Sequence, residues 1–232
     1  MHSFLIVFIS GTSPNTLISN NELGRYSLNI FSSSTVETDK SSKLQSQIIV
    51  SNPSCANEEK SVDYVMRGEG DYTWSIFLES LFIKKELKDV PGLVQRNNKE
   101  FKKNPMAPLI HDMDALAIPA WDLVPMERYF EIAMYHNPYV KSGRVGCIMT
   151  SRGCPDRCYF CSSTVFFGHK FRQMSPERVG EMVDYLVDEF KIKELQIEDD
   201  NFAVNPVRVL KICERIKHHN LRITMPNAMR AD

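Results

Sequence analysis

The sequence predicts an α/β protein in which strands and helices alternate along two separate stretches of the chain. In residues 62–87 a strand pattern, a glycine-containing turn and a helical pattern follow one another, and the same alternation returns from residue 144 onward. Between these stretches, residues 97–143 are rich in proline. Because proline interrupts long helices, we expect these residues to form an extended connector between two α/β parts.

Composition limits the function classes. The chain has 232 residues, of which 43% are hydrophobic and 25% charged, as in ordinary soluble proteins. A net charge of −1 argues against a nucleic-acid-binding protein. No apolar run reaches the roughly 20 residues of a membrane helix, and Phe4–Ser10 is interpreted as a buried strand rather than a targeting segment. We therefore expect a cytoplasmic protein, in which clustered cysteines are metal ligands or catalytic groups rather than disulfides.

The sequence predicts secondary structure for only part of residues 1–96. Residues 1–46 stay unassigned, because much of this stretch has the Ser- and Thr-rich composition of a loop or a disordered segment. Residues 47–96 are expected to form the end of an open α/β sheet. Within them, Val62–Gly70 is predicted as a strand and turn, and Asp71–Leu87 as a helix that Asp71 caps.

The second part, residues 144–232, repeats the strand–helix alternation more regularly. Arg144–Thr150 is a strand candidate, and Ser175 followed by Pro176 predicts the start of a helix. The further expected elements are a strand at Glu194–Asp199, a helix from Pro206 and a strand at Leu221–Pro226. The predicted inward face of the second helix consists of Val209, Leu210, Cys213 and Ile216. Such alternation indicates parallel βα units with functional residues after the strands.

Three closely spaced cysteines follow the first of these strands. Cys154, Cys158 and Cys161 are spaced C-x3-C-x2-C. A disulfide bond between residues so close together would constrain the fold little, and it would leave the third thiol unpaired. His169 is able to complete a Cys3His zinc site, whereas an iron–sulfur cluster held by three thiolates would keep one iron open to another ligand. The spacing favours the cluster and leaves zinc as the alternative.

Other reactive residue types have simpler interpretations. Cys147 and Cys213 lie in apolar patterns and are expected to be buried core thiols. His218 and His219 end a predicted helix, where a cation interacts favourably with the helix dipole, so we expect a capping role rather than metal binding.

The cysteine motif also resembles that of a known family. "CPDRCYFC", with an aromatic residue before the last cysteine, resembles the signature of radical S-adenosylmethionine enzymes, and "SRGCPDRCYFCSS" is similar to the subgroup with an N-terminal cobalamin-binding domain. Three further stretches support the resemblance. "VDYVMRGEGDYT" is similar to the end of that domain, "DMDALAIPAWDLVPMERY" to its connector, and "IEDDNFAVN" to the second barrel strand. The resemblance implies a Rossmann-like sheet followed by the first βα units of a partial TIM barrel.

The resemblance also implies cofactors and site residues. Cys154, Cys158 and Cys161 would ligate a 4Fe-4S cluster, whose fourth iron S-adenosylmethionine chelates. One electron from an external donor, such as a flavodoxin or ferredoxin, would then cleave S-adenosylmethionine and start radical chemistry on an unknown small-molecule substrate. Phe160 is expected to lie against the adenine. We further expect one of the carboxylates at the next strand end to contact the methionyl amino group or the substrate; the candidates are Glu198, Asp199 and Asp200.

The sequence departs from the family pattern in two ways. The D-x-H-x-x-G motif, whose histidine would ligate the cobalt of cobalamin, does not occur in residues 1–60, where His2 is the only histidine. Cobalamin binding is therefore doubtful from the sequence. Residues 144–232 hold three strand candidates, whereas the family's partial barrel resembles six βα units, so the chain resembles a fragment. A non-catalytic zinc module or an inactive truncated product remains the alternative.

Overall fold

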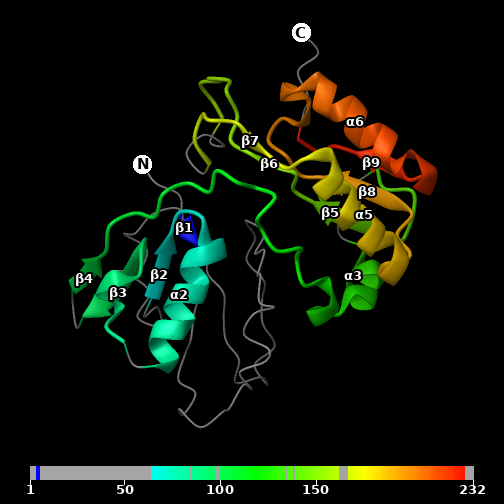
Figure 1. The fold of residues 1–232 in the computed structure, drawn as a ribbon. Coiled ribbons are helices and arrows are strands. Elements are labelled where there is room, and N and C mark those ends of the chain that lie inside the picture. The colour runs from blue at the N-terminus through cyan, green and yellow to red at the C-terminus, as the bar shows by residue number, and fades with distance from the viewer. Residues whose placement is uncertain are drawn as a thin grey trace. The chain divides into compact units, whose positions relative to one another are not determined.

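The fold is known from a computed structural model, which describes residues 4–5 and 64–227 except 84, 98–99, 134, 138 and 162–166. Of the sheet expected in residues 47–96, residues 47–63 lie outside this range. The chain divides into two units, Met1–Ile110 and His111–Asp232 (Figure 1). The finer division predicted from the sequence, at residues 46, 96 and 143, stays a prediction.

The first unit combines an antiparallel sheet with one helix. Its elements are β1 (Phe4–Leu5), β2 (Tyr64–Arg67), α2 (Gly70–Phe82), η2 (Leu87–Asp89), β3 (Leu93–Asn97) and β4 (Glu100–Lys103). The strand order is β1-β2-β3-β4, and each neighbouring pair is antiparallel. A Rossmann-like sheet is mainly parallel, so the predicted arrangement is wrong for the described strands of this unit. The order strand, helix, strand does not by itself decide whether the second strand returns parallel or antiparallel.

The helix of this unit packs one face onto the sheet. Phe77 is buried against Met66 and Leu93, and its ring meets that of Tyr64 edge-on at 5.0 Å. Burying such side chains contributes about 1.5–3 kcal/mol each. The predicted cap is wrong: the helix begins after Glu69, and Asp71 lies in the first turn. The helix also ends at Phe82, five residues before the predicted end.

The second unit contains the predicted parallel sheet. Its elements are η3 (Trp121–Leu123), α3 (Met126–Ile132), β5 (Val145–Ile148), β6 (Ser151–Arg152), β7 (Arg172–Gln173), α5 (Pro176–Phe190), β8 (Glu194–Ile197), η4 (Phe202–Val204), α6 (Pro206–Ile216), η5 (Lys217–His219) and β9 (Arg222–Thr224). Strands β5, β8 and β9 pair in parallel in that order. Helices α5 and α6 connect successive strands and contact each other (Figure 1).

The helix starts of this unit follow the sequence signals. The Ser175 hydroxyl accepts a hydrogen bond from Arg178 N at 3.1 Å, with Pro176 in the first helical position, as predicted. Asn205 caps α6 in the same way, at 3.1 Å from Arg208 N. Each cap satisfies a backbone donor that the helix itself leaves without a partner, which stabilises a helix by about 1 kcal/mol.

The inward face of α6 differs from the prediction. Arg208, Ile212 and Ile216 are buried, whereas Leu210 is 71% exposed and Cys213 is exposed. The apolar pattern predicted the wrong face because a charged residue, Arg208, occupies the first buried position of α6. No described helix is long and apolar enough to cross a membrane.

Candidate functional site

The three clustered cysteines lie on a loop that leaves the carboxyl end of β5. Strands β6 and β7 pair antiparallel and close the base of this loop, with Ser151 opposite Gln173. Gly153 begins the loop at φ +83°, where a Cβ would overlap the carbonyl oxygen of Lys170. Cys154 N donates a hydrogen bond to Gly168 O at 3.3 Å. The loop, described except for residues 162–166, is thus anchored at its two ends.

The thiols differ in their surroundings. All three are free, Cys154 being half-buried and Cys158 and Cys161 exposed. Burial raises the pKa of the Cys154 thiol, and the carboxylates of Asp156 and Asp200 raise it further. Cys161 N donates to Cys158 O at 3.1 Å, which makes a tight turn between these two ligand candidates. Three free thiols on one loop form a suitable donor set for an iron–sulfur cluster.

Cys147, in contrast, lies on the sheet and not on the loop. Burial raises the pKa of its thiol to about 12, and the Glu198 carboxylate adds to this effect. The thiolate, which is the metal-binding form, is therefore strongly disfavoured at Cys147. Cys147 is half-buried, so the expectation of a buried core thiol is only partly met there, and it is wrong for the exposed Cys213.

Phe160 and the zinc candidate His169 are both exposed on the loop. Phe160 is 78% exposed, and its only described ring contact is an edge-on one with Tyr159 at 5.4 Å, which is itself exposed. Phe160 is therefore not a packed core residue. Its predicted contact with adenine and a zinc-binding role of His169 both stay predictions.

Asp199 holds the start of the loop. Its Oδ1 accepts hydrogen bonds from Thr150 N at 2.5 Å and Ser151 N at 3.1 Å, while its Oδ2 accepts from the hydroxyls of Thr150 and Ser151, each at 2.6 Å. Asp199 is 1% exposed, and this burial raises the pKa of its carboxyl. Hydrogen bonds from Thr150 and Ser151 and the charge of Arg208 act in the opposite direction but do not outweigh the burial. Both oxygens are thus engaged in tying β8 to the residues that lead to Cys154.

The two neighbouring carboxylates have different surroundings. Glu198 Oε2 pairs with His136 Nδ1 at 2.9 Å. Asp200 is half-buried, and its charge acts on the Cys154 thiol. The contact predicted for one of these three acids with S-adenosylmethionine or substrate stays a prediction.

Sequence reasoning missed Arg208 as a functional residue. The buried guanidinium donates from Nε to Met174 O at 2.7 Å and from Nη2 to Thr150 O at 2.9 Å. It therefore connects α6 to both strands at the base of the loop. The only sequence signal was a charged residue three positions after the Asn205 cap, which is indistinguishable from an exposed arginine.

A row of polar side chains crosses the sheet on the face opposite the helices. Cys147, Gln196 and Thr224 lie in register on adjacent strands, whereas Gly146, on the other face, approaches Leu186 and Ile192. Gln196 Nε2 and Thr224 Oγ1 are buried without a hydrogen-bond partner among the described residues. Buried polar atoms are nearly always paired, so this face is suited to a polar ligand.

The fold of the chain is similar to that of solved enzyme structures. The radical S-adenosylmethionine methyltransferase TsrM of Kitasatospora setae has a similar structure, with a TM-score of 0.54 and 16% identity over 70% of this chain and 32% of that one. A second structure of TsrM, with cobalamin and a [4Fe-4S] cluster bound, gives a TM-score of 0.51. At this identity the likeness establishes a shared α/β fold. No protein-family model matches the chain.

Two curated relatives are closer in sequence. An uncharacterized methyltransferase of Pyrococcus horikoshii is 38% identical over 171 residues, which is 74% of this chain and 35% of the relative. The cytidylyl-2-hydroxyethylphosphonate methyltransferase of Streptomyces wedmorensis is 34% identical, over 65% of this chain and 32% of the relative. The chain is thus related to the cobalamin-dependent radical S-adenosylmethionine enzymes, as its cysteine motif predicted. It spans about a third of the length of these relatives.

Proposed function

We propose that this chain forms the cluster-binding part of a radical S-adenosylmethionine enzyme. Cys154, Cys158 and Cys161 would hold a 4Fe-4S cluster, which when bound supplies the electron for reductive cleavage of S-adenosylmethionine. The observation that carries the proposal is the anchoring of a three-thiol loop at the carboxyl ends of parallel strands by Asp199 and Arg208. Functional residues collect at this end of such sheets.

The chain's own residues would position the reactants. Asp199 and Arg208 hold the first loop residues and thereby limit the positions open to Cys154. Asp200, beside that thiol, would contact the methionyl amino group, and the exposed ring of Phe160 would cover the adenine. The Nε2 of Gln196, which is buried without a hydrogen-bond partner among the described residues, would donate to a polar ligand on this face of the sheet.

The reaction class and overall architecture belong to the same proposal. Both curated relatives are called methyltransferases, which supports methyl transfer to a small molecule as the reaction. Strands β5, β8 and β9 with their two helices would be the first βα units of a partial barrel. A flavodoxin or ferredoxin would supply the electron. For cobalamin the residues do not fit a histidine-ligated cobalt, because residues 1–60 contain no D-x-H-x-x-G motif.

Anaerobic reconstitution with iron and sulfide tests the proposal. We expect a brown protein with about four irons and four sulfides per chain, and loss of both in Cys158→Ala. Cys213→Ala is the matched control, because Cys213 is also an exposed thiol but lies on α6. Since the chain spans a third of its relatives, cluster content is the first readout, and methionine release from S-adenosylmethionine under reductant is the second.

The outcomes separate the alternatives. A protein that stays colourless after reconstitution, or that loses iron equally in the Cys158 and Cys213 variants, contradicts the cluster. One zinc without iron, lost in His169→Ala, would instead establish a zinc site made of the three cysteines and His169.

A further inference from the structure

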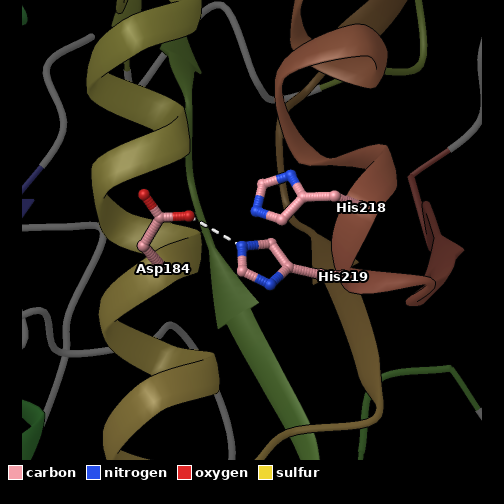
Figure 2. A group of neighbouring side chains, drawn as sticks. All are labelled: Asp184, His218 and His219. Carbon is pink, nitrogen blue, oxygen red and sulfur yellow. Dashed lines mark hydrogen bonds and ion pairs between the residues drawn. The ribbon is translucent and has the colours of Figure 1, made fainter.

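We propose a second metal site, for a divalent transition metal, formed by Asp184, His218 and His219. Asp184 projects from α5, and the two histidines project from η5, which follows α6 (Figure 2). One ligand atom from each of the three side chains lies within 4.8 Å of the others. Among the described residues no other group of three histidine, cysteine or carboxylate side chains meets this condition.

The contacts in the group differ from those of a helix cap. His219 Nε2 lies 2.7 Å from Asp184 Oδ1, a carboxylate 35 residues earlier on another helix. The rings of His218 and His219 have centroids 3.9 Å apart, so the second imidazole lies beside the same carboxylate. Figure 2 shows both rings on the side of α6 that faces Asp184. Both histidines lie in the last turn of η5, where the predicted capping role stays a prediction, and His219 in addition makes a contact with another helix.

The carboxylate is charged and has one oxygen directed toward the histidines. Partial burial opposes ionisation of Asp184, but hydrogen bonds from Arg215 and His219 outweigh it and lower the pKa of this carboxyl. Arg215 pairs with both oxygens: Nη2 with Oδ2, and Nη1 with Oδ1 at the longer distance of 3.3 Å. Oδ1 is also the oxygen close to His219. Arg215 would thus orient the ligand from outside the metal's own shell. Its positive charge weakens cation binding, so we expect a reversible site rather than a permanently held structural ion.

The donor types select the metal. Two imidazole nitrogens and one carboxylate oxygen suit Zn²⁺, Co²⁺, Ni²⁺ or Cu²⁺, whereas Mg²⁺ and Ca²⁺ prefer sites made of oxygen alone. His218 is exposed, so water or another small ligand can complete the coordination. Figure 2 shows that all three side chains come from helical segments.

The site lies at the opposite end of the sheet from the cysteines. The histidines precede β9 by two residues, at the end where the parallel strands begin, while the cysteine loop follows the carboxyl end of β5. A four-residue strand spans about 13 Å. A metal here would join α5 to the end of α6, the helix whose Arg208 holds the base of the cysteine loop. The inference does not depend on the proposed function.

Zinc titration of the full chain, free of any histidine tag and stripped with a chelator, tests the site. We expect the wild-type chain to bind one equivalent of Zn²⁺ more than His218→Ala, or to bind it at least about tenfold more tightly. Zinc taken up by the cysteines is common to both proteins and cancels in the comparison. His111→Ala, which removes a histidine elsewhere in the same unit, should behave as wild type.

Two further measurements make the result decisive. Co²⁺ bound at this site should show visible bands without the thiolate charge-transfer absorption that binding at the cysteines produces. His218 is exposed, so its replacement is expected to leave the circular dichroism spectrum unchanged. Equal zinc stoichiometry and affinity in the wild type and in His218→Ala would overturn the proposal, whatever the outcome of the iron reconstitution.

Discussion

Asp199 is the single residue on which the geometry of the candidate site depends most. It is buried at the end of β8 and accepts four hydrogen bonds, two from backbone amides and two from hydroxyls. A buried donor that loses its acceptor costs about 1–3 kcal/mol. The sequence identified Asp199 as one of three adjacent acids, and the structure gives it the particular task of positioning Thr150 and Ser151.

Replacement of Asp199 should separate positioning from a charge-dependent role. We expect Asp199→Ala to lower the free energy of unfolding by about 3 kcal/mol or more, because four buried donors lose their acceptor. Asp199→Asn should recover at least half of this loss, since its carbonyl can still accept from both amides and its NH2 can donate to both hydroxyls. Urea unfolding measures both.

The exposed Asp188→Asn on α5 is the control and should unfold as the wild type does. Wild-type stability of Asp199→Ala would contradict the positioning role.

The cysteine loop is the element that connects fold and function. Its base is a two-residue antiparallel pair, and its first residue, Gly153, has a positive φ and lies against the backbone of Lys170. Only glycine fits there without strain, because any Cβ would collide with a carbonyl oxygen that cannot move independently of β7. The loop conformation therefore depends on this glycine as well as on the cysteines.

A pair of glycine variants tests this dependence. Gly153→Ala should lose most of the iron taken up on reconstitution and should accelerate hydrogen exchange in residues 153–161. Gly143→Ala is a matched control, because a Cβ at Gly143 meets no atom within 4 Å. If both variants take up iron like the wild type, the loop does not need its observed path to bind a cluster.

On the scale of the whole molecule, the second unit presents two groups of potential metal ligands at opposite ends of one sheet. The cysteine loop follows β5, and the Asp184, His218 and His219 group precedes β9. Substitutions that are far apart and share no partner usually have additive effects.

The double variant Cys158→Ala/His218→Ala should therefore show the sum of the single effects. We expect the iron content to follow Cys158 alone and the zinc bound outside the cysteines to follow His218 alone. Elemental analysis of the four proteins measures both. A His218→Ala chain that also loses its iron would show that the two ends are coupled.

What the sequence determined by itself is local in character. The spacing of Cys154, Cys158 and Cys161 predicted the candidate cluster loop and the family, and Ser175 with Pro176 predicted the start of α5. These signals act within a few residues of the chain, through turn geometry and helix capping, so they can be recognised without knowledge of the fold.

Only the tertiary structure decided the features that join distant residues. From the sequence, Arg208 is expected to be a surface residue. In the structure it is buried, and the carbonyls of Thr150 and Met174 accept its hydrogen bonds. His219 meets Asp184 across 35 residues, and the first sheet is antiparallel although strand and helix alternate. Each of these outcomes depends on which surfaces pack together. The packing partners are far apart in the sequence, so local sequence patterns do not predict them.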